Sequence, residues 1–344
     1  MDRRSFVATA ALAAAMPLRR AKAAEVTLRV HHFLSPRSTA QLRFIEPWAE
    51  RVMAQSDGRL EVQIFPAMQL GGAPPGLYDQ ARDGTVDLVW TLPASTPGRF
   101  PSTEAFELPF MPASAEANSQ AIMEFGTKHL KEEFAETQPI VWFAHDPGLI
   151  HTVSKPVRTR ADLQGLRIRF PTRLLGETLA VLGATPVGMP IPEVPQALQQ
   201  GVIDGAAMPW EVVPALKVHE LTRHHTAMAG TRGLYTTTFV FTMNKARYES
   251  LPDDLRAVID ANSGLALAKE VGRAWDENAA LGLAAAQAVA GSEFHAIAPD
   301  ELESWKEATA PIVADWVRQM NERGRDGEAL VAEATALIAK YAGG

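Results

Sequence analysis

The chain has 344 residues, a formal net charge of −7 at pH 7 and no cysteine. This length is sufficient for two α/β domains of ordinary size, and the lack of cysteine excludes disulfides, thiolate nucleophiles and cysteine-ligated metals. Because lysine and arginine are scattered, we expect neither nucleic acid nor an anionic membrane surface as a partner. No apolar run after residue 24 reaches the roughly 18 residues that a bilayer requires, so no direct membrane insertion of the mature protein is expected.

Residues 1–24 have the pattern of an export signal. A basic start precedes an apolar stretch over 6–18, and small residues suited to cleavage follow at 23–24. The arginine pair at 3–4 resembles a twin-arginine signal, although the general route stays open. We therefore predict that the mature protein is exported to the periplasm.

Predicted strands and helices alternate over the first part of the mature chain. An alternating strand at 26–30 is followed by a helix over 38–55, and a turn and second strand lie in 56–66. A further helix and turn lead to a third strand that ends at Trp90. This order predicts a parallel sheet, whose ligand crevices lie at the carboxyl ends of its strands.

A second alternating series begins near residue 140. Its strand-like segments, separated by helices and short loops, are 139–145, 166–170, 184–189 and 202–208. The β-rich stretch 235–244 is long enough to return from this unit to the first. The chain is therefore expected to cross between two units more than once.

Helical patterns dominate the rest of the chain. Residues 252–290 read as one long helical run that could span both units, and Pro299 opens a further amphipathic helix. We predict an export signal at 1–24 and a two-domain α/β, periplasmic-binding-protein-like fold with crossing strands and a domain-spanning helix. The predicted parts are domain I at 25–145 plus about 234–265, domain II at 146–233 plus about 275–310, and C-terminal helices at 311–344.

No segment carries a catalytic or metal-binding motif. The stretch "HELTRHH" places His219 and His224 five residues apart, about 140° out of line on a helix, so we interpret it as a solvated helix end. "GGAPPG" at 71–76 lacks the Gly-Lys-Ser/Thr ending of a phosphate loop. With no nucleophile elbow and no acid/base pair, we expect no enzyme, no metal and no cofactor.

Four ordered segments carry a resemblance to a known family. They are "FPAMQLGG" at 65–72, "FELPFM" at 106–111, "KPVRTRADLQGLRIRFPT" at 155–172 and "LGATPVGMPIPEVPQALQQGVIDGAAMPWE" at 182–211. Together they resemble the solute-binding proteins of tripartite ATP-independent periplasmic (TRAP) transporters, the dicarboxylate-receptor family. The resemblance, which runs from about residue 26 to 310, implies a periplasmic receptor that captures an organic acid anion between two domains. It also implies delivery to TRAP membrane permease subunits, without turnover.

The resemblance implies that Arg169 binds the ligand carboxylate. In the strand "GLRIRF", Arg167 and Arg169 alternate with apolar residues, and the family's carboxylate clamp is the second of these arginines. A guanidinium is a permanently charged fork that binds a carboxylate bidentately, and a closed cleft excludes screening water. Arg167 is expected to be solvated or structural.

Departures from the family pattern favour an aromatic or apolar monocarboxylate, such as a benzoate-, mandelate- or cinnamate-like acid. The segment around His151 has no second arginine that could pair with another ligand carboxylate. Met208 and Trp210 are apolar or aromatic at positions where a polyhydroxy ligand would need hydrogen-bond donors. A small hydroxy, keto or C4-dicarboxylic acid is the alternative, with Arg173 or a histidine neutralising the second charge. A cation-assisted site at Trp210 and Glu211, a sensory receptor and an exported hydrolase or lyase also stay open.

The other candidates for ligand contact come from strand ends and from the return crossing. We predict His31 and Phe33 after the first strand, Trp90 and Thr91 at the end of the third, and Tyr235 near the crossing.

Overall fold

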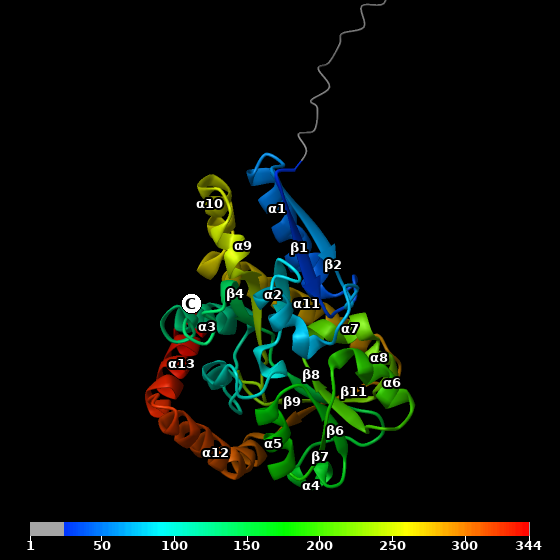
Figure 1. Cartoon of the computed structure of the whole chain (residues 1–344). Coiled ribbons are helices and arrows are strands. Elements are labelled where there is room, and N and C mark those ends of the chain that lie inside the picture. Colours follow the sequence, from blue (N-terminus) through cyan, green and yellow to red (C-terminus); the bar gives the residue numbers. More distant parts are fainter. Residues whose placement is uncertain (1–23, 344) are drawn as a thin grey trace, which may run out of the picture.

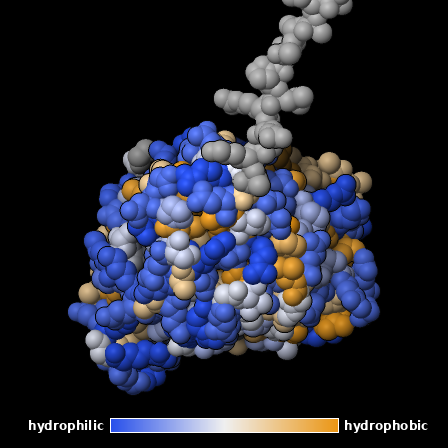
Figure 2. Space-filling model, turned by 45° about the horizontal axis from the view of Figure 1, so that its top comes forward, coloured by the Kyte–Doolittle hydropathy of each residue, from blue (hydrophilic) through white to orange (hydrophobic). Residues whose placement is uncertain are grey.

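The computed structural model describes residues 24–343 and contains two sheets with helices around them (Figure 1). The export signal predicted for residues 1–24 lies outside the described residues, apart from Ala24. No helix within 24–343 is long and apolar enough to cross a membrane. Figure 2 shows a mainly hydrophilic face on which the apolar patches are small and separate.

The first sheet has the strand order β2-β1-β3-β10-β4. Its strands are β1 (Val26–His32), β2 (Leu60–Phe65), β3 (Leu88–Thr91), β4 (Thr137–Ala144) and β10 (Thr238–Asn244). As predicted, β1 runs parallel to β2 and β3. β10 returns from the second half of the chain and pairs antiparallel with β3 and β4, so the predicted crossing is present.

The second sheet has the strand order β11-β9-β5-β8-β6-β7. Its strands are β5 (Leu149–Thr152), β6 (Arg167–Phe170), β7 (Thr185–Gly188), β8 (Gly205–Met208), β9 (His224–Met228) and β11 (Glu293–Ile297). β6 pairs parallel with β7 and β8, β9 with β11, and β5 antiparallel with β8 and β9. Because β9 begins at His224, the interpretation of "HELTRHH" as a solvated helix end is wrong from this residue on.

Helices of very different length connect and cover the sheets. The helices are α1 (Glu46–Gln55), α2 (Leu77–Arg82), α3 (Ala115–His129), α4 (Arg160–Leu163), α5 (Arg173–Val181), α6 (Val194–Gln199), α7 (Val213–Leu216), α8 (Val218–Leu221), α9 (Lys245–Glu249), α10 (Asp253–Ala261), α11 (Gly264–Gln287), α12 (Pro299–Glu322) and α13 (Gly327–Ala342). Short turns are η1 (Ala40–Ile45), a π-type turn before α1, and the 3₁₀ turns η2 (Pro74–Gly76), η3 (Pro93–Ser95), η4 (Pro101–Phe106), η5 (Ile191–Glu193) and η6 (Trp210–Val212).

The long helical run predicted for 252–290 is divided in two. The backbone leaves the helix at Asn262, and Gly264 has a φ of +77°, a left-handed conformation that favours glycine. The helix that follows, α11, nevertheless contacts both halves of the molecule, since it packs on α3 and β4 and on η6 beside β8. The expected domain-spanning helix is therefore α11 alone.

The last two helices lie along the outside of the molecule (Figure 1). α12 packs against α5, which belongs to the second sheet's half, and α13 packs against α3 and η4, which belong to the first. The C-terminal helices therefore bridge the halves on the side away from β2.

Candidate ligand-binding site

A cavity of about 290 Å³ lies between the two sheets. Most of its lining comes from the carboxyl ends of β1, β3, β4, β6, β7 and β8 and from the segment that leads into β10, and two prolines of η2 add to it. Its full lining is Phe33, Leu34, Pro74, Pro75, Trp90, Leu92, Ala94, Ser95, His145, Arg169, Phe170, Pro171, Gly188, Met189, Pro190, Ile191, Pro209, Glu211, Val212, Tyr235, Thr237 and Phe239. The walls are mainly apolar, with a few polar groups, which is typical of a small-molecule site.

Arg169 is the charged group at the centre of this site. It lies near the end of β6 and is 3% exposed, and its guanidinium donates to the carbonyl oxygens of Met189 (3.1 Å) and Ala207 (3.2 Å). No carboxylate within residues 24–343 forms a salt bridge with it. Burial lowers the pKa of Arg169 to about 10, so the side chain stays charged at neutral pH. A buried cation held only by carbonyl oxygens can accept an anion bidentately.

Three buried polar atoms of the lining have no hydrogen-bond partner within the described part of the chain. They are Nε1 of Trp90, Oη of Tyr235 and Oγ1 of Thr237. Buried polar atoms in folded proteins are almost always paired, and each of these three can donate a hydrogen bond. Together with Arg169 they form a donor-rich set suited to a carboxylate or a hydroxyl group.

His145 is a neutral neighbour of these donors. Burial lowers its pKa to about 4. Its Nε2 accepts a hydrogen bond from the backbone N–H of Thr237 at 2.9 Å, and its Nδ1–H donates to the carbonyl oxygen of Asp146. The imidazole therefore positions the Thr237 segment without adding charge.

Glu211 is the one acidic residue of the described lining. It is 8% exposed, and burial raises its pKa to about 7. Below that pH the carboxyl group is neutral, so it can donate a hydrogen bond without repelling a bound anion.

Aromatic rings form a flat wall of the cavity. Phe33 and Trp90 are stacked, with ring centroids 4.9 Å apart and planes 7° apart, and Phe239 lies 5.0 Å from Trp90. The ring of Phe170 belongs to the lining from the other sheet. Offset stacking on such surfaces stabilises a planar ring beyond the burial of its area.

Four of the nine residues predicted for ligand contact line this cavity: Phe33, Trp90, Arg169 and Tyr235. Thr91 and Met208 are buried near it but do not belong to its lining. Thr91 follows Trp90 directly, and successive strand residues point to opposite faces.

The other three lie apart from the cavity lining. Nδ1 of His31 lies 2.7 Å from Oε1 of Gln80. Arg173 forms ion pairs with Glu104 at 2.7 Å and with Glu177 at 2.8 Å. Trp210 packs against the ring of His151, with centroids 4.8 Å apart, and faces a different surface depression.

Sequence reasoning missed three prominent members of the lining. They are His145, Phe170 and Phe239. Because β4 ends at Ala144 and β6 at Phe170, the carboxyl-end rule applied to every strand would have indicated His145 and Phe170. β10 runs antiparallel, so Phe239 reaches the same edge at the start of its strand, which no local pattern indicates.

Comparisons with known proteins identify the family of this chain. Residues 30–319 match the family described as "Bacterial extracellular solute-binding protein, family 7" (DctP). The chain is similar to a marine metagenome TRAP solute-binding protein specific for aromatic acid ligands, in complex with metahydroxyphenylacetate: 50% identity, TM-score 0.90, covering 92% of this chain and 99% of that one.

Two further solved structures are similar along most of the chain. A TRAP solute-binding protein from Rhodoferax ferrireducens, with copurified benzoate, is 48% identical with a TM-score of 0.89, covering 92% of this chain and 98% of the other. One from Bordetella bronchiseptica, with bound (R)- and (S)-mandelate, is 30% identical with a TM-score of 0.85, covering 91% and 99%.

Proposed function

The chain belongs to family 7 of the bacterial extracellular solute-binding proteins, a family of TRAP receptors, and on that premise we propose that it captures an aromatic monocarboxylate around Arg169. The observation that carries this proposal is the buried guanidinium of Arg169, which has no carboxylate partner within residues 24–343 and lies in a cavity walled by stacked aromatic rings. Three similar receptors were solved with aromatic acids.

The binding mode follows from the chemistry of the lining. The ligand carboxylate accepts hydrogen bonds from Arg169 and from the hydroxyl group of Tyr235, whose Oη is otherwise unpartnered in the described chain. The ring lies along the Phe33–Trp90 wall. Binding therefore neutralises a buried charge and covers apolar surface at the same time.

A dicarboxylate fits this lining poorly. Arg169 is the one permanently charged cation among the described lining residues, and His145 is neutral because burial lowers its pKa to about 4. Arg173, which could neutralise a second carboxylate, is paired with Glu104 and Glu177. A second carboxylate would be buried without a partner, which costs several kcal/mol, on the order of a broken buried ion pair.

We further propose that the protein works in the periplasm and delivers the acid to a TRAP membrane permease without chemical turnover. The family assignment and the location of the cavity between two sheets support capture by closure of the halves. A sensory receptor with the same site is the alternative. Uptake of labelled benzoate into vesicles that contain the permease separates the two, since only a transport receptor stimulates uptake.

Calorimetric titration of the purified protein with benzoate, 3-hydroxybenzoate, mandelate and succinate tests the ligand class. We expect binding of the aromatic acids, little or no binding of succinate, and loss of binding in Arg169→Met. Arg167→Met is the matched control, because Arg167 lies on the same strand but is paired with Asp204. Equal affinity for succinate and benzoate would contradict the proposed class, and unchanged binding in Arg169→Met would contradict the proposed site.

A further inference from the structure

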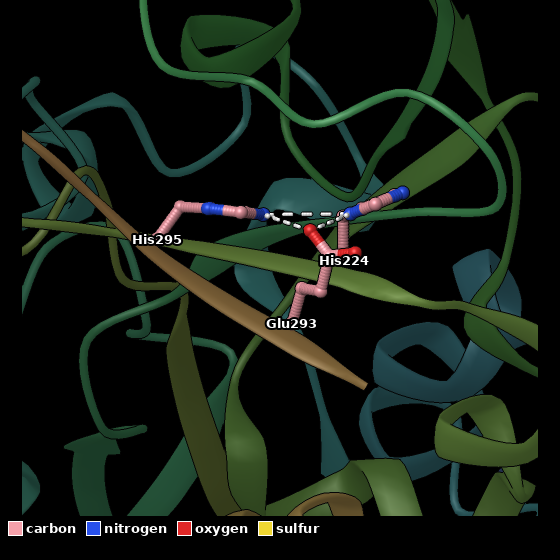
Figure 3. A group of neighbouring side chains, drawn as sticks. All are labelled: His224, Glu293 and His295. Atoms are coloured by element: carbon pink, nitrogen blue, oxygen red, sulfur yellow. Dashed lines mark hydrogen bonds and ion pairs between the residues drawn. The ribbon is translucent and has the colours of Figure 1, made fainter. Parts of the chain in front are cut away.

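The pairing of β9 and β11 brings three potential metal ligands to one face of the second sheet. In this parallel pair His224 is opposite Glu293, and His295 is opposite Thr226. Residues two apart on a strand point to the same face, so Glu293 and His295 share a face, and the directly paired His224 lies beside Glu293 on that face. Figure 3 shows the three side chains directed toward one another from the two strands.

We propose that His224, Glu293 and His295 form a binding site for a zinc(II) ion. Nδ1 of His224 lies 3.3 Å from Oε2 of Glu293 and 3.4 Å from Nε2 of His295, and that nitrogen is 3.6 Å from the same Oε2. In tetrahedral zinc, with bonds of about 2.0 to 2.1 Å, neighbouring ligand atoms are roughly 3.3 to 3.4 Å apart. A single point close to 2.1 Å from all three atoms therefore exists, without rearrangement of the backbone.

The identity of the ion follows from the donor set. Two imidazole nitrogens and one carboxylate oxygen suit zinc and other late first-row divalent ions, whereas magnesium and calcium prefer all-oxygen sites with more ligands. The side chain of Glu293 is 51% exposed and that of His224 is 8% exposed, so the site opens to solvent on the glutamate side. Both residues line a surface depression, which gives the ion access and leaves the fourth position to water.

Arg158 competes with a metal ion for His295. Its Nε lies 3.4 Å from Nδ1 of His295 and donates toward it. When Nε2 of His295 binds a metal, Nδ1 carries the proton and needs an acceptor instead, so Arg158 must turn away. A glutamine at this position offers such an acceptor through its side-chain oxygen and removes the positive charge.

The ion would connect the edge strand β11 to β9. β11 is the outermost strand of its sheet and follows α11, the helix that contacts both halves. None of the three ligands lines the cavity around Arg169. The zinc site is therefore expected to stabilise the second sheet while leaving affinity for an aromatic acid unchanged.

Titration of the metal-free, tag-free protein with zinc chloride and with cobalt(II) chloride tests the site. We expect one equivalent of zinc to bind and to raise the melting temperature, and cobalt to give the intense visible absorption of a tetrahedral complex. Glu293→Gln and His295→Ala should each weaken zinc binding by at least about 10-fold. His219→Ala is the matched control, because it removes a neighbouring histidine that does not belong to the cluster, and Arg158→Gln should strengthen binding.

Glu293 is exposed, so Glu293→Gln is expected to fold, and benzoate binding and circular dichroism check the fold of every variant. The proposal is overturned if no zinc binds to the intact protein. It is equally overturned if zinc binds with the same affinity to correctly folded Glu293→Gln and His295→Ala, since the ion then lies elsewhere.

Discussion

Arg167 and Arg169 lie two residues apart on β6, but of the two only Arg167 has a carboxylate partner within residues 24–343. Asp204 accepts hydrogen bonds from Nε and Nη2 of Arg167 at 2.9 and 2.7 Å, and the Arg167 side chain is 43% exposed. Arg169 is buried and bonded to carbonyl oxygens. An unpaired buried cation lowers stability, and a ligand that supplies the anion recovers the loss.

Arg169→Met is therefore expected to stabilise the ligand-free protein while it abolishes binding. Replacing a buried charge by an apolar side chain of similar length is neutral or stabilising, here by roughly 1 to 3 kcal/mol. Urea unfolding with and without benzoate measures both effects. Arg167→Met, which removes an exposed pair, should change stability by less than about 1 kcal/mol and keep the stabilisation by benzoate.

The second prediction concerns the pH dependence of stability and binding through Glu211. Burial raises its pKa from 4.5 to about 7, so the folded protein holds a proton that the unfolded chain has already lost in this range. Stability should therefore fall as the pH rises from about 4.5 to about 7, by at most about 3 kcal/mol from this group. Affinity for benzoate should fall above pH 7, because ionised Glu211 repels the bound anion.

Glu107 provides the matched control for this prediction. Its pKa is also raised to about 7 by burial, but its carboxylate accepts hydrogen bonds from Thr238 and does not line the cavity. Glu107→Gln and Glu211→Gln should each reduce the loss of stability between pH 5 and pH 8. Only Glu211→Gln should flatten the pH profile of benzoate affinity, and the same flattening in Glu107→Gln would refute a local effect of Glu211.

Sequence patterns predicted the parts of the site that depend on strand ends. The alternation of apolar and polar residues predicted the strands β1, β3 and β6. The rule that ligands bind at the carboxyl ends of strands predicted Phe33 and Trp90, and the family resemblance indicated Arg169; all three line the cavity. The same rule also selected Thr91, which the structure leaves out of the cavity lining. Which face of a strand meets the ligand depends on how the two halves stack, and no local pattern encodes that.

Contacts between distant segments were beyond sequence reasoning. His224 was judged by its spacing from His219 within one expected helix, whereas its neighbours Glu293 and His295 are about 70 residues further along on β11. Strand pairing overrode the helical interpretation there, because β9 is buried between β5 and β11. Glu104, the partner of Arg173, is likewise 69 residues away.

The third prediction is that Arg173 stabilises the junction of the halves and does not bind the ligand. Oε2 of Glu104 accepts hydrogen bonds from Nη2 of Arg173 (2.7 Å) and Nε1 of Trp316 (3.2 Å), and Glu104 is 8% exposed. Arg173→Ala leaves this carboxylate poorly paired, so the free energy of unfolding should fall by about 1 to 3 kcal/mol. Benzoate affinity should change by less than about 3-fold.

A double-mutant cycle with Glu104→Gln checks this pairing. The two substitutions should be non-additive by about 1 kcal/mol in urea unfolding, since they remove the same interaction. A large loss of succinate binding in Arg173→Ala, with stability unchanged, would instead identify Arg173 as a residue for a second ligand carboxylate.

The last prediction concerns two glycines of α11, each pressed against one half of the molecule. A Cβ at Gly272 would lie 2.6 Å from the carbonyl oxygen of Ala115 in α3, and one at Gly282 would lie 2.0 Å from that of Trp210 in η6. Alanine raises helix propensity by about 1 kcal/mol, but forcing backbone apart costs typically 1 to 3 kcal/mol or more. Both Gly272→Ala and Gly282→Ala should therefore lower the melting temperature.

The two substitutions should differ in their effect on binding. Trp210 directly precedes Glu211, which lines the cavity, whereas the Gly272 contact lies on α3 of the other half. Gly282→Ala should therefore also weaken benzoate binding, and Gly272→Ala should not. Leu281→Ala is the control, because Leu281 is 62% exposed and its truncation should change stability by no more than about 0.5 kcal/mol. Equal benzoate affinity in both glycine variants would show that the packing of α11 against η6 does not determine the shape of the cavity.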